Sequence, residues 1–530
     1  MKMEILERAI RAETTRIVVV AFLCFVSFFV SCSSGERIEG FIHYRLNYNP
    51  STLDPAYIVD VTGGTIAAKL FNGLVRLDEN LAVVSDIAES WVISPDGTTY
   101  TFRIKSDVRF TNQRKIMASD FKYSFERILN PTSKSPNMWV FEKVVGAKSY
   151  AKGETTEVSG IVVRDHHTLQ IRLEKPFSPF LNLLTMTAAY VVPREEVERW
   201  GSDFATHPIG SGPFILREWR HNDRLLLEKN ERYFSGKARV EGICYRVIPE
   251  DLTAVTEFEL GNLDVLAVPA SEFRRFKSSE EWKGLIVSRE GVNSYYLGLN
   301  CSRPPFQHPL ARKAISQAID RRKILETYYE TRGDLACGPV PAALRSWQPP
   351  EPLPYDPKTA SELIRRSGLQ DRTILFYITA DQEVADIAEI IQSYLKLAGL
   401  SVTIKQLEWS SYKAALNKGE ADMFWISWWA DYPDPENFLF PLFHSSNHGP
   451  SGNRTWYTNK TVDALIEKGQ RLTTGPARSS YYATAEQIIV SDVPSVFFWH
   501  KADIALRQPT VRNYELYPIY SIDKGLEVSF

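Results

Sequence analysis

The sequence predicts an α/β fold, and three observations support that class. Between residues 382 and 431, helical and extended patterns alternate as helix, strand, helix and strand, which is typical of an α/β unit with a parallel sheet. The chain has 530 residues, enough for roughly two to four domains. Its hydrophobic content of 44% and charged content of 24% indicate a globular rather than a disordered chain.

The N-terminus carries the pattern of a secretion signal. Arg8, Arg11 and Arg16 precede the uncharged run 17–30, which is shorter than the about 20 apolar residues of a membrane-spanning helix. The run ends in FVSC, so Cys32 stands where a bacterial lipobox would place a lipidated cysteine, although Phe29 is bulky for the first position of that motif. We expect residues 1–31 to be a lipoprotein signal peptide and residues 32–40 a flexible tether. An ordinary signal anchor is the alternative.

Charge and cysteine content exclude several classes of site. The formal net charge is -2 and no polybasic run occurs, so we expect no nucleic-acid partner. Of the five cysteines, Cys24 leaves with the signal and Cys32 would carry lipid. The remaining Cys244, Cys301 and Cys337 allow one disulfide at most, and without a C-x-x-C they predict no thiol-ligated zinc.

The first half of the chain mixes strands and helices. A strand is expected from Phe41 into a loop, and another over 98–105 after a PDG turn. The spacing of apolar residues predicts a helix over 119–129, with Ser119 as N-cap and a stop near Asn130. A glycine-rich turn at 210–214 leads to two strands around HND at 221–223, and a further strand follows at 243–249.

The second half supplies the alternation that defines the fold class. Apolar spacing predicts one helix from Pro309 to Leu325. The expected elements that follow are a helix over 384–398 closed by Gly399, a strand over 400–409, a short helix closed by Gly419 and a buried strand over 421–430.

No catalytic motif is present. The sequence lacks H-E-x-x-H, G-x-S-x-G, G-x-x-x-x-G-K-[ST] and G-x-G-x-x-G, and the GSGPF turn at 210–214 has no lysine to bind phosphate. His444 and His448 flank a polar loop, where they either touch a ligand or metal or remain ordinary loop histidines. We therefore expect a protein that is not an enzyme, with no cofactor and no metal site.

Six segments, in order along the chain, resemble the bacterial extracellular solute-binding proteins of the oligopeptide/dipeptide type, family 5. These are the ligand-capturing subunits of ABC importers. The resemblance covers the chain from about Phe41 to near its end. The matching segments are LDP at 53–55, LFNGL to DVRF at 70–110, ASDFKYSFERILNP at 118–131, HPIGSGPFILREW at 207–219, YYLGLNCSRPPF to AIDR at 295–321, and WWADYPDPENFLFPLF at 428–443.

The resemblance implies a two-lobed periplasmic-binding-protein clamshell with an additional third domain. Lobe I would combine residues 33–75, 193–290 and 505–530. The extra domain II would be 76–192, and lobe III would be 291–504. Ligand would lie between lobes I and III and be buried by hinge closure.

The resemblance also implies how a ligand is held. An extended oligopeptide would add as a strand between residues 46–49 and 426–429, so that main-chain hydrogen bonds supply the affinity. Asp431 matches the acid that holds the α-ammonium of the ligand; the alternative is a helix cap, for which Asp434 before Pro435 is better placed. The expected ligand-binding residues are Asn47, Tyr48, Asn49, Ser427, Trp428, Trp429 and Asp431.

The tryptophans of the 421–430 strand should divide between its two faces. Trp425 and Trp429 should point to one side and Trp428 to the other, one side packing in the core and the other lining the cleft. Trp429, next to Asp431 in the sequence, is the preferred wall residue.

The chain departs from the pattern of oligopeptide binders at the far end of the ligand. Glu383, Leu416 and Trp425 stand where the resemblance leads one to expect basic residues, so recognition of the ligand carboxylate is open. Residues that could substitute are Lys418, Arg345, Arg454 and His448. A tryptophan-rich cleft poor in cations would also suit an oligosaccharide, and the scaffold carries metal chelates in other members.

The expected setting follows from the same resemblance. We expect a monomer at the periplasmic face of the cell envelope, anchored to a membrane by lipid on Cys32, with ABC importer permease subunits as partners.

Overall fold

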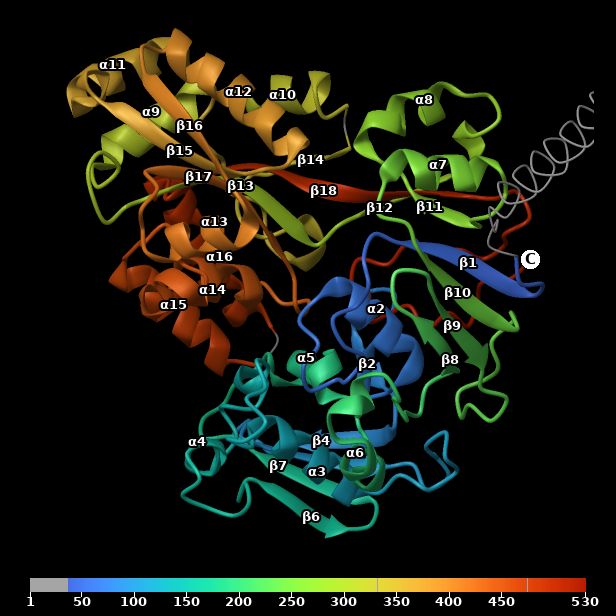
Figure 1. Ribbon diagram of the computed structural model, residues 1–530. Coiled ribbons are helices and arrows are strands. Elements are labelled where there is room, and N and C mark those ends of the chain that lie inside the picture. Colours follow the sequence, from blue (N-terminus) through green and yellow to red (C-terminus); the bar gives the residue numbers. More distant parts are fainter. Residues whose placement is uncertain (1–36, 331, 474) are drawn as a thin grey trace, which may run out of the picture.

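The computed structural model describes residues 37–330, 332–473 and 475–530 (Figure 1). The predicted signal peptide at 1–31, the lipidation site Cys32 and most of the tether therefore lie outside the described residues. Within the described ranges, no helix is both long enough and apolar enough to cross a membrane.

One mixed sheet of 12 strands extends from the upper left of the molecule in Figure 1 to its right-hand middle. Its main path is β16-β15-β17-β13-β18-β11-β1-β10-β9-β8, with β12 and β14 paired to β18. The strands are β1 Phe41–Leu46, β8 Phe214–Arg220, β9 Arg224–Lys229, β10 Gly242–Val247, β11 Val265–Ala267, β12 Ile286–Glu290, β13 Asn293–Leu299, β14 Gly333–Leu335, β15 Thr373–Thr379, β16 Ser401–Leu407, β17 Met423–Trp429 and β18 Ser495–Arg507.

Parallel pairing, which the sequence predicts, is confirmed for part of this sheet. Strand β15 pairs in parallel with β16 and β17, and β1 pairs in parallel with β10 and β11. The pairs of β13 with β17 and of β18 with its neighbours are antiparallel, so the sheet as a whole is mixed. The long strand β18 connects its two halves, and the predicted boundary at residue 505 falls within this strand. The division into three domains stays a prediction.

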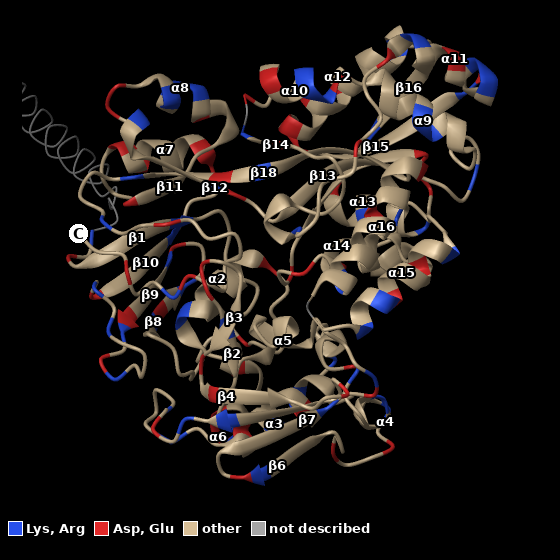
Figure 2. Ribbon diagram, turned by 180° about the vertical axis from the view of Figure 1, so that it is seen from behind, with Lys and Arg blue, Asp and Glu red and all other residues tan. Residues whose placement is uncertain are grey.

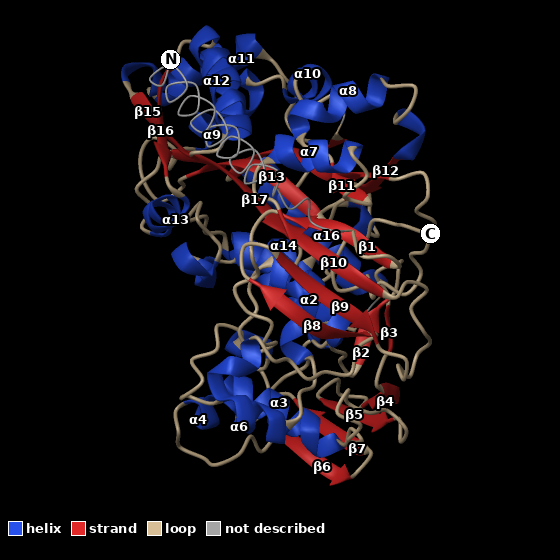
Figure 3. Cartoon of the chain, turned by 45° about the vertical axis from the view of Figure 1, so that its right-hand side comes forward, coloured by secondary structure: helices blue, strands red, loops and turns tan. Residues whose placement is uncertain are grey.

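Two groups of helices cover the half of the sheet that holds β13 and β17 (Figure 3). The neighbours Phe424 and Trp425 of β17 pack in different hydrophobic clusters, as expected because successive strand residues point to opposite faces. On the Trp425 side are α9 Pro309–Ala318, α10 Arg321–Thr327, α11 Pro357–Ser367 and α12 Gln382–Leu397; on the Phe424 side are α13 Trp409–Asn417, α14 Glu436–Phe443, α15 Lys460–Arg471 and α16 Pro476–Asp492.

The other half of the sheet is also covered by helices. One cluster joins α2 (Val61–Leu70) and the C-terminal segment to β1 and β10. A second cluster joins Leu506 of β18 to α7 (Asp251–Glu259) and α8 (Phe273–Ser278). Lys, Arg, Asp and Glu are spread over the outer helices, whereas β13 and β17 carry no charged residue (Figure 2).

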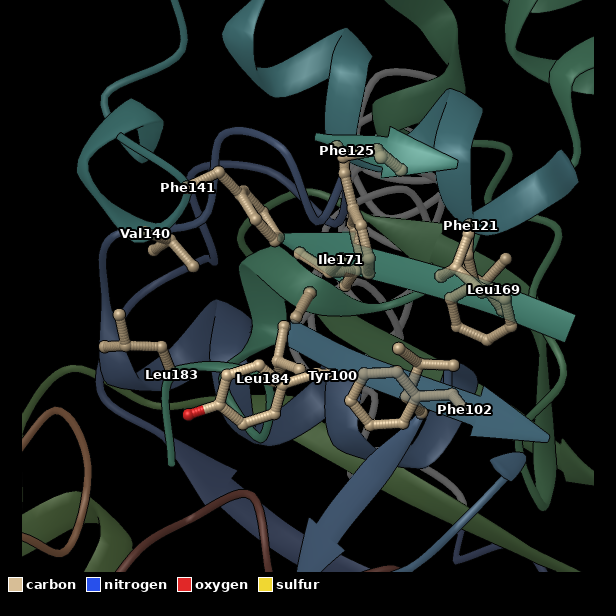
Figure 4. Packing of buried hydrophobic residues seen from close by; sticks show 14 of the residues in the cluster. Tyr100, Phe102, Phe121, Phe125, Val140, Phe141, Leu169, Ile171, Leu183 and Leu184 are labelled. Atoms are coloured by element: carbon tan, nitrogen blue, oxygen red, sulfur yellow. The ribbon is translucent and has the colours of Figure 1, made fainter. Parts of the chain in front are cut away.

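A separate four-stranded antiparallel sheet, β4-β5-β7-β6, lies at the bottom of Figure 1. Its core stacks Phe125 on Phe141, with ring centroids 4.4 Å apart, above Phe102 and Ile171 (Figure 4). The elements of this region and of its junction with α2 are β2 Val75–Leu77, β3 Val83–Ser85, β4 Ala88–Ile93, β5 Thr99–Ile104, α3 Ala118–Leu129, α4 Ala147–Ala151, β6 Ile161–Asp165, β7 Thr168–Arg172, α5 Phe180–Leu183 and α6 Arg194–Trp200.

Most of the predicted elements are confirmed, including the strand at 98–105 and the two strands around HND. Gly399 and Gly419 follow their helices with φ of +95° and +69°, a conformation that favours glycine. The prediction of one helix from Pro309 to Leu325 is wrong. Residue Ile319 is extended, and the Asp320 side chain accepts from the N–H of Lys323 at 3.0 Å, which starts a new helix.

The structure also defines the N-cap of α3 and the state of the cysteines. Ser119 is not the N-cap of α3, because the Asp120 carboxylate accepts from the N–H of Met117 at 2.8 Å and the helix begins at Ala118. Cys244, Cys301 and Cys337 are all free thiols, so the structure forms no disulfide among the three cysteines it describes.

Candidate functional site

The C-terminal half of strand β17 has one open edge. On one side β13 pairs with β17 over its whole length, from Met423 to Trp429. On the other side β15 pairs only at Met423 and Phe424. The carbonyl of Trp425 accepts from the Tyr412 hydroxyl, and beyond it no described strand covers this edge. Residues 426–429 thus present unpaired backbone, the arrangement on which another chain can add as a strand.

The three tryptophans of β17 occupy the predicted faces. Trp425 is buried, with its ring centroid 4.8 Å from that of Phe498. Trp429 lies on the same face, with its ring centroid 6.4 Å from that of Tyr295. The residue is 41% exposed. Trp428 packs on the opposite face and its indole N–H donates to Asn437 Oδ1 at 3.4 Å. The alternation is therefore confirmed, and Trp429 is the most exposed of the three.

Ser427 lies between these tryptophans, directly opposite Tyr295 of β13. It is half-buried, and its backbone belongs to the open edge of β17.

Asp431 carries a carboxylate without a cationic partner. Its N–H donates to Asn437 Oδ1 at 2.9 Å, and the Asn437 amide donates to Asp431 Oδ2 at 3.4 Å. No Lys, Arg or His of the described ranges forms an ion pair with it. The side chain reaches solvent, but the protein around it removes much of the bulk water, and this desolvation raises the pKa of Asp431 to about 6 against the opposing effect of the Asn437 amide.

The alternative assignment of Asp431 as a helix cap is not what the structure contains. Asp434 accepts from the N–H of Glu436 at 2.9 Å, at the first residue of α14. Pro435 is the N-cap residue rather than the first residue of the helix. Asp434 also binds the buried Arg478, with Nη2–Oδ distances of 2.7 and 2.8 Å. The carboxylate of Asp431 is thus left unused by α14.

The loop that carries Asp431 is where the parts of the molecule meet. Ala430 packs against a small cluster, called here the junction cluster, of Leu77, Val292, Ile519 and Ile522. Tyr432 is 4% exposed and belongs to the core of the region with the four-stranded sheet. Its ring centroid lies 6.5 Å from that of Trp139. Asp431 therefore stands between residues of both halves of the large sheet and of the smaller region.

The predicted residues after β1 lie on the other half of the large sheet. Asn47 and Tyr48 are exposed, Tyr48 to 54%. Asn49 is fixed by Asn222, which it contacts twice, at 2.6 and 3.0 Å. Within the described parts of the chain, no hydrogen bond joins these three residues to β17.

Tyr520 lies close both to α2 and to Asp431, and the sequence patterns do not predict a role for it. Its ring lies against α2, since a Cβ on Gly64 would come within 2.4 Å of it. Burial, with smaller contributions from the nearby carboxylates of Asp431 and Asp60, raises the pKa of Tyr520 to about 12. Asp60 in turn accepts from the Ser51 hydroxyl at 2.6 Å, just beyond the predicted segment 46–49. No local motif marks Tyr520, because its position depends on the return of the C-terminal segment.

His444, His448 and Glu383 each have a polar partner within the structure. His444 Nδ1 lies 2.7 Å from the Ser446 hydroxyl, and His448 Nε2 lies 3.0 Å from the Tyr457 carbonyl, so the two rings have different hydrogen-bond partners. Glu383 is paired with Arg332 at 3.3 Å and Lys501 at 3.6 Å.

Leu416 and Trp425 are buried in the core. Across the described residues, no group of three His, Cys, Asp or Glu side chains is arranged to hold a metal ion.

An α/β fold of two linked, helix-covered sheet halves with an added smaller region is that of the solute-binding proteins. The model of bacterial extracellular solute-binding proteins, family 5 Middle, matches residues 82–450. The chain belongs to this family.

Known proteins similar to this chain differ in what they are named for. This chain is 26% identical over 458 residues to the glutathione-binding protein GsiB of Salmonella typhi, and the match covers 84% of this chain and 86% of the relative. It is 26% identical over 503 residues to the heme-binding protein A of Haemophilus influenzae, covering 90% of each. The structure of the Escherichia coli murein tripeptide binding protein MppA superposes with a TM-score of 0.78 at 25% identity, covering 92% of this chain and 97% of that one.

Proposed function

We propose that this protein captures extracytoplasmic oligopeptides between its two lobes and delivers them to an ABC importer. The observation that carries the proposal is Asp431, a carboxylate without a described cationic partner at the end of a strand with an open edge. In this proposal the protein binds and releases its ligand without changing it chemically.

The open edge of β17 supports main-chain recognition. A peptide in extended form can pair with Ser427, Trp428 and Trp429 while its side chains point away from the strand. Asn47, Tyr48 and Asn49 would face the peptide from the other lobe when the lobes close on it. Such pairing depends little on the peptide's sequence, so we expect tolerance of side chains.

The state of Asp431 supports recognition of an α-ammonium group. A carboxylate in poorly hydrated surroundings is costly without a counter-charge, and its raised pKa reflects that cost. An ammonium group placed against it offsets the cost and fixes the register of the peptide along β17. Asn437 keeps the carboxylate in place before the ligand arrives, because it holds both the backbone and the side chain of Asp431.

The names of the relatives support a peptide, and one of them points elsewhere. MppA is named for a murein tripeptide and GsiB for glutathione, whereas another relative is named for heme. The second candidate is therefore a non-peptide solute on the same scaffold, such as an oligosaccharide or a metal chelate. The observation in its favour is Trp429, whose 41% exposed ring could stack on a sugar.

The membrane anchor, the cellular location and the oligomeric state are also part of the proposal. The signal pattern before Cys32 supports a lipid anchor on that residue and a place at the periplasmic face of the envelope. We infer a monomer that meets its permease subunits with the lobes closed.

Native mass spectrometry of the protein, purified without denaturation, tests the proposal. We expect co-purified peptides, identified by mass and fragmentation. Asp431→Ala should then weaken binding of free-amine peptides and leave N-acetylated peptides unaffected. Equal binding of N-acetylated and free peptides by the unaltered protein would overturn the role of Asp431. A co-purified saccharide, with a matching rise in melting temperature, would favour the second candidate.

A further inference from the structure

Arg345 carries a guanidinium group that forms no hydrogen bond and no ion pair with the described residues. It follows the 3₁₀ turn Ala342–Leu344, in the part of the chain between β14 and α11. Its Nε and Nη1 atoms are buried and have no hydrogen-bond partner, and none of its nitrogens forms an ion pair with a residue that the structure describes. Nε and Nη1 carry three of the five N–H donors of a guanidinium, and leaving them buried without an acceptor is costly.

The two titratable groups on which the charge of Arg345 acts, Glu486 and His500, already have hydrogen-bond partners. Glu486 contributes one carboxylate oxygen to the Trp347 indole N–H at 2.8 Å and the other to the N–H of Val340 at 3.1 Å. His500 donates from Nδ1 to the Asn293 carbonyl at 2.6 Å. Burial, with a smaller contribution from Arg345, lowers the pKa of His500 to about 4, so its ring is neutral. Neither group neutralises the guanidinium by direct contact.

Arg345 and Asp431 are placed at the same junction. Leu344 and Ala430 both pack against the junction cluster. The residue that follows each of them, Arg345 and Asp431, is charged and has no ion-pair partner among the described residues. The two charges have opposite sign, yet they form no ion pair with each other in the described structure. Val292 of the cluster accepts from the N–H of Ala430 at 2.9 Å, which ties this junction to the end of β17.

The other cations that could substitute at the far end of the ligand are in different states. Lys418 is a surface residue with its side chain 72% exposed. Arg454 donates to Asn417 at 3.1 Å, and His448 is engaged with the Tyr457 carbonyl. Of these four candidates, only Arg345 has buried side-chain nitrogens without a hydrogen-bond partner among the described residues.

We propose that Arg345 receives a carboxylate of the ligand, and that the ligand is a zwitterionic short peptide with its ammonium on Asp431 and its carboxylate on Arg345. This inference rests on the proposed function, because it takes the peptide and the role of Asp431 as given. The planar guanidinium can bind both carboxylate oxygens through two parallel N–H···O bonds. The carboxylate comes either from the C-terminus of the peptide or from an acidic side chain near its amino end.

A role in ligand binding makes a prediction about the free protein that a structural role does not. A residue that holds the fold together lowers stability when it is replaced. Arg345 has no side-chain hydrogen bond or ion pair to lose among the described residues, so Arg345→Gln should change the melting temperature of the ligand-free protein little. This measurement also establishes that the variant is folded before its binding is tested.

The binding experiment compares four pools of synthetic peptides, two to five residues long, on ligand-free purified protein by native mass spectrometry. The first pool has free ends and no acidic residue, the second is the same pool with C-terminal amides, the third has C-terminal amides and one Asp or Glu, and the fourth is the first pool N-acetylated. We expect the unaltered protein to bind the second pool roughly 10- to 100-fold more weakly than the first. Recovery of binding with the third pool identifies a side chain as the source of the carboxylate.

The variants separate this inference from the proposed function. Arg345→Gln should bind the first pool as weakly as the unaltered protein binds the second, and should no longer distinguish the two. Lys418→Gln, which removes an exposed cation of the same lobe, should behave as the unaltered protein. Equal binding of the first two pools together with loss of the fourth overturns the role of Arg345 and leaves peptide capture standing. Failure of every pool to bind overturns both.

Discussion

Asn437 holds Asp431 from two directions, accepting from its N–H at 2.9 Å and donating to its carboxylate at 3.4 Å. Asn437 is 2% exposed on the first turn of α14, so it is a rigid support for a side chain that reaches solvent. We expect Asn437→Ala to weaken binding of free-amine peptides roughly 10-fold, because the loss of a hydrogen bond to a charged group is worth about 1.5–3 kcal/mol. Isothermal titration against the peptide that co-purifies checks this. Asn447→Ala, in the loop after α14, is a control that should leave affinity unchanged.

The raised pKa of Asp431 predicts how stability depends on pH. The folded pKa of about 6 lies above the ordinary value, so the folded ligand-free protein binds the proton more tightly than the unfolded chain does. This carboxyl group therefore favours the folded state most at low pH, and that contribution is lost as the pH rises from about 4 through 6. Melting temperatures between pH 4 and 7.5 should show this component in the unaltered protein and not in Asp431→Asn. Identical pH profiles for the two proteins would contradict the prediction.

The same group predicts how ligand binding depends on pH. An ammonium ligand requires the ionised carboxylate, so affinity should fall as the pH drops below about 6. Near that pH, binding should release a proton to the buffer. Titration calorimetry in two buffers of different ionisation enthalpy measures the release directly. Asp431→Asn should show neither the release nor the loss of affinity.

Trp425 and Trp429 share one face of β17 but should respond differently to replacement. Trp425 is 4% exposed and packs on Phe498 and Trp499, so Trp425→Ala should lower the free energy of unfolding by about 3–5 kcal/mol. Trp429 is 41% exposed, and Trp429→Ala should cost less than about 1 kcal/mol while weakening ligand binding. Denaturant unfolding and titration of both variants separate the effects. A large loss of stability in Trp429→Ala would assign it to the core.

The buried pair of Asp434 and Arg478 should be sensitive to the loss of one partner. Their side chains are 6% and 9% exposed. Arg478→Met leaves the Asp434 carboxylate without its counter-charge and should destabilise the protein by about 3–5 kcal/mol. Arg471→Met breaks an exposed pair with Glu467 and should change stability by at most about 1 kcal/mol. Thermal unfolding of the two variants gives the comparison, and similar losses in both would contradict it.

Gly64 should be required for the position of Tyr520. A Cβ at Gly64 would come within 2.4 Å of the Tyr520 ring, so Gly64→Ala has to displace the ring from its place near Asp431. We expect weaker ligand binding and a lower melting temperature. Gly284→Ala is the matched control, because nothing lies within 4 Å of the added Cβ there. If Gly64→Ala bound ligand normally, Tyr520 would be only a neighbour of the site.

The features that the sequence predicts well depend on local pattern. The alternation of tryptophans in β17 and the glycines that end α12 and α13 follow from residues close together in the chain. The break between α9 and α10 is also local, but the apolar spacing continues across it and hides the cap formed by Asp320.

The parts of the site that sequence patterns do not reveal depend on distant contacts. Tyr520 reaches α2 only because the C-terminal segment returns to the first half of the sheet. The sequence contains several cations that could meet a ligand carboxylate, and which of them has unused donors depends on what surrounds each one. Arg345 differs from Arg454 in this respect, because Nε of Arg454 donates to Asn417 whereas the buried Nε and Nη1 of Arg345 have no hydrogen-bond partner among the described residues.

Strand β18 has a mechanical consequence. It pairs with β14 through Lys501 and with β12 from Ala502 onwards, so the two halves of the large sheet share one continuous backbone. A change of angle between them has to be taken up as torsion of that backbone near Lys501, which the Asn293 side chain braces with hydrogen bonds of 2.7 and 2.8 Å. We therefore expect the angle between the two halves to resist change more than it would with two flexible linkers, because any change would twist this hydrogen-bonded backbone.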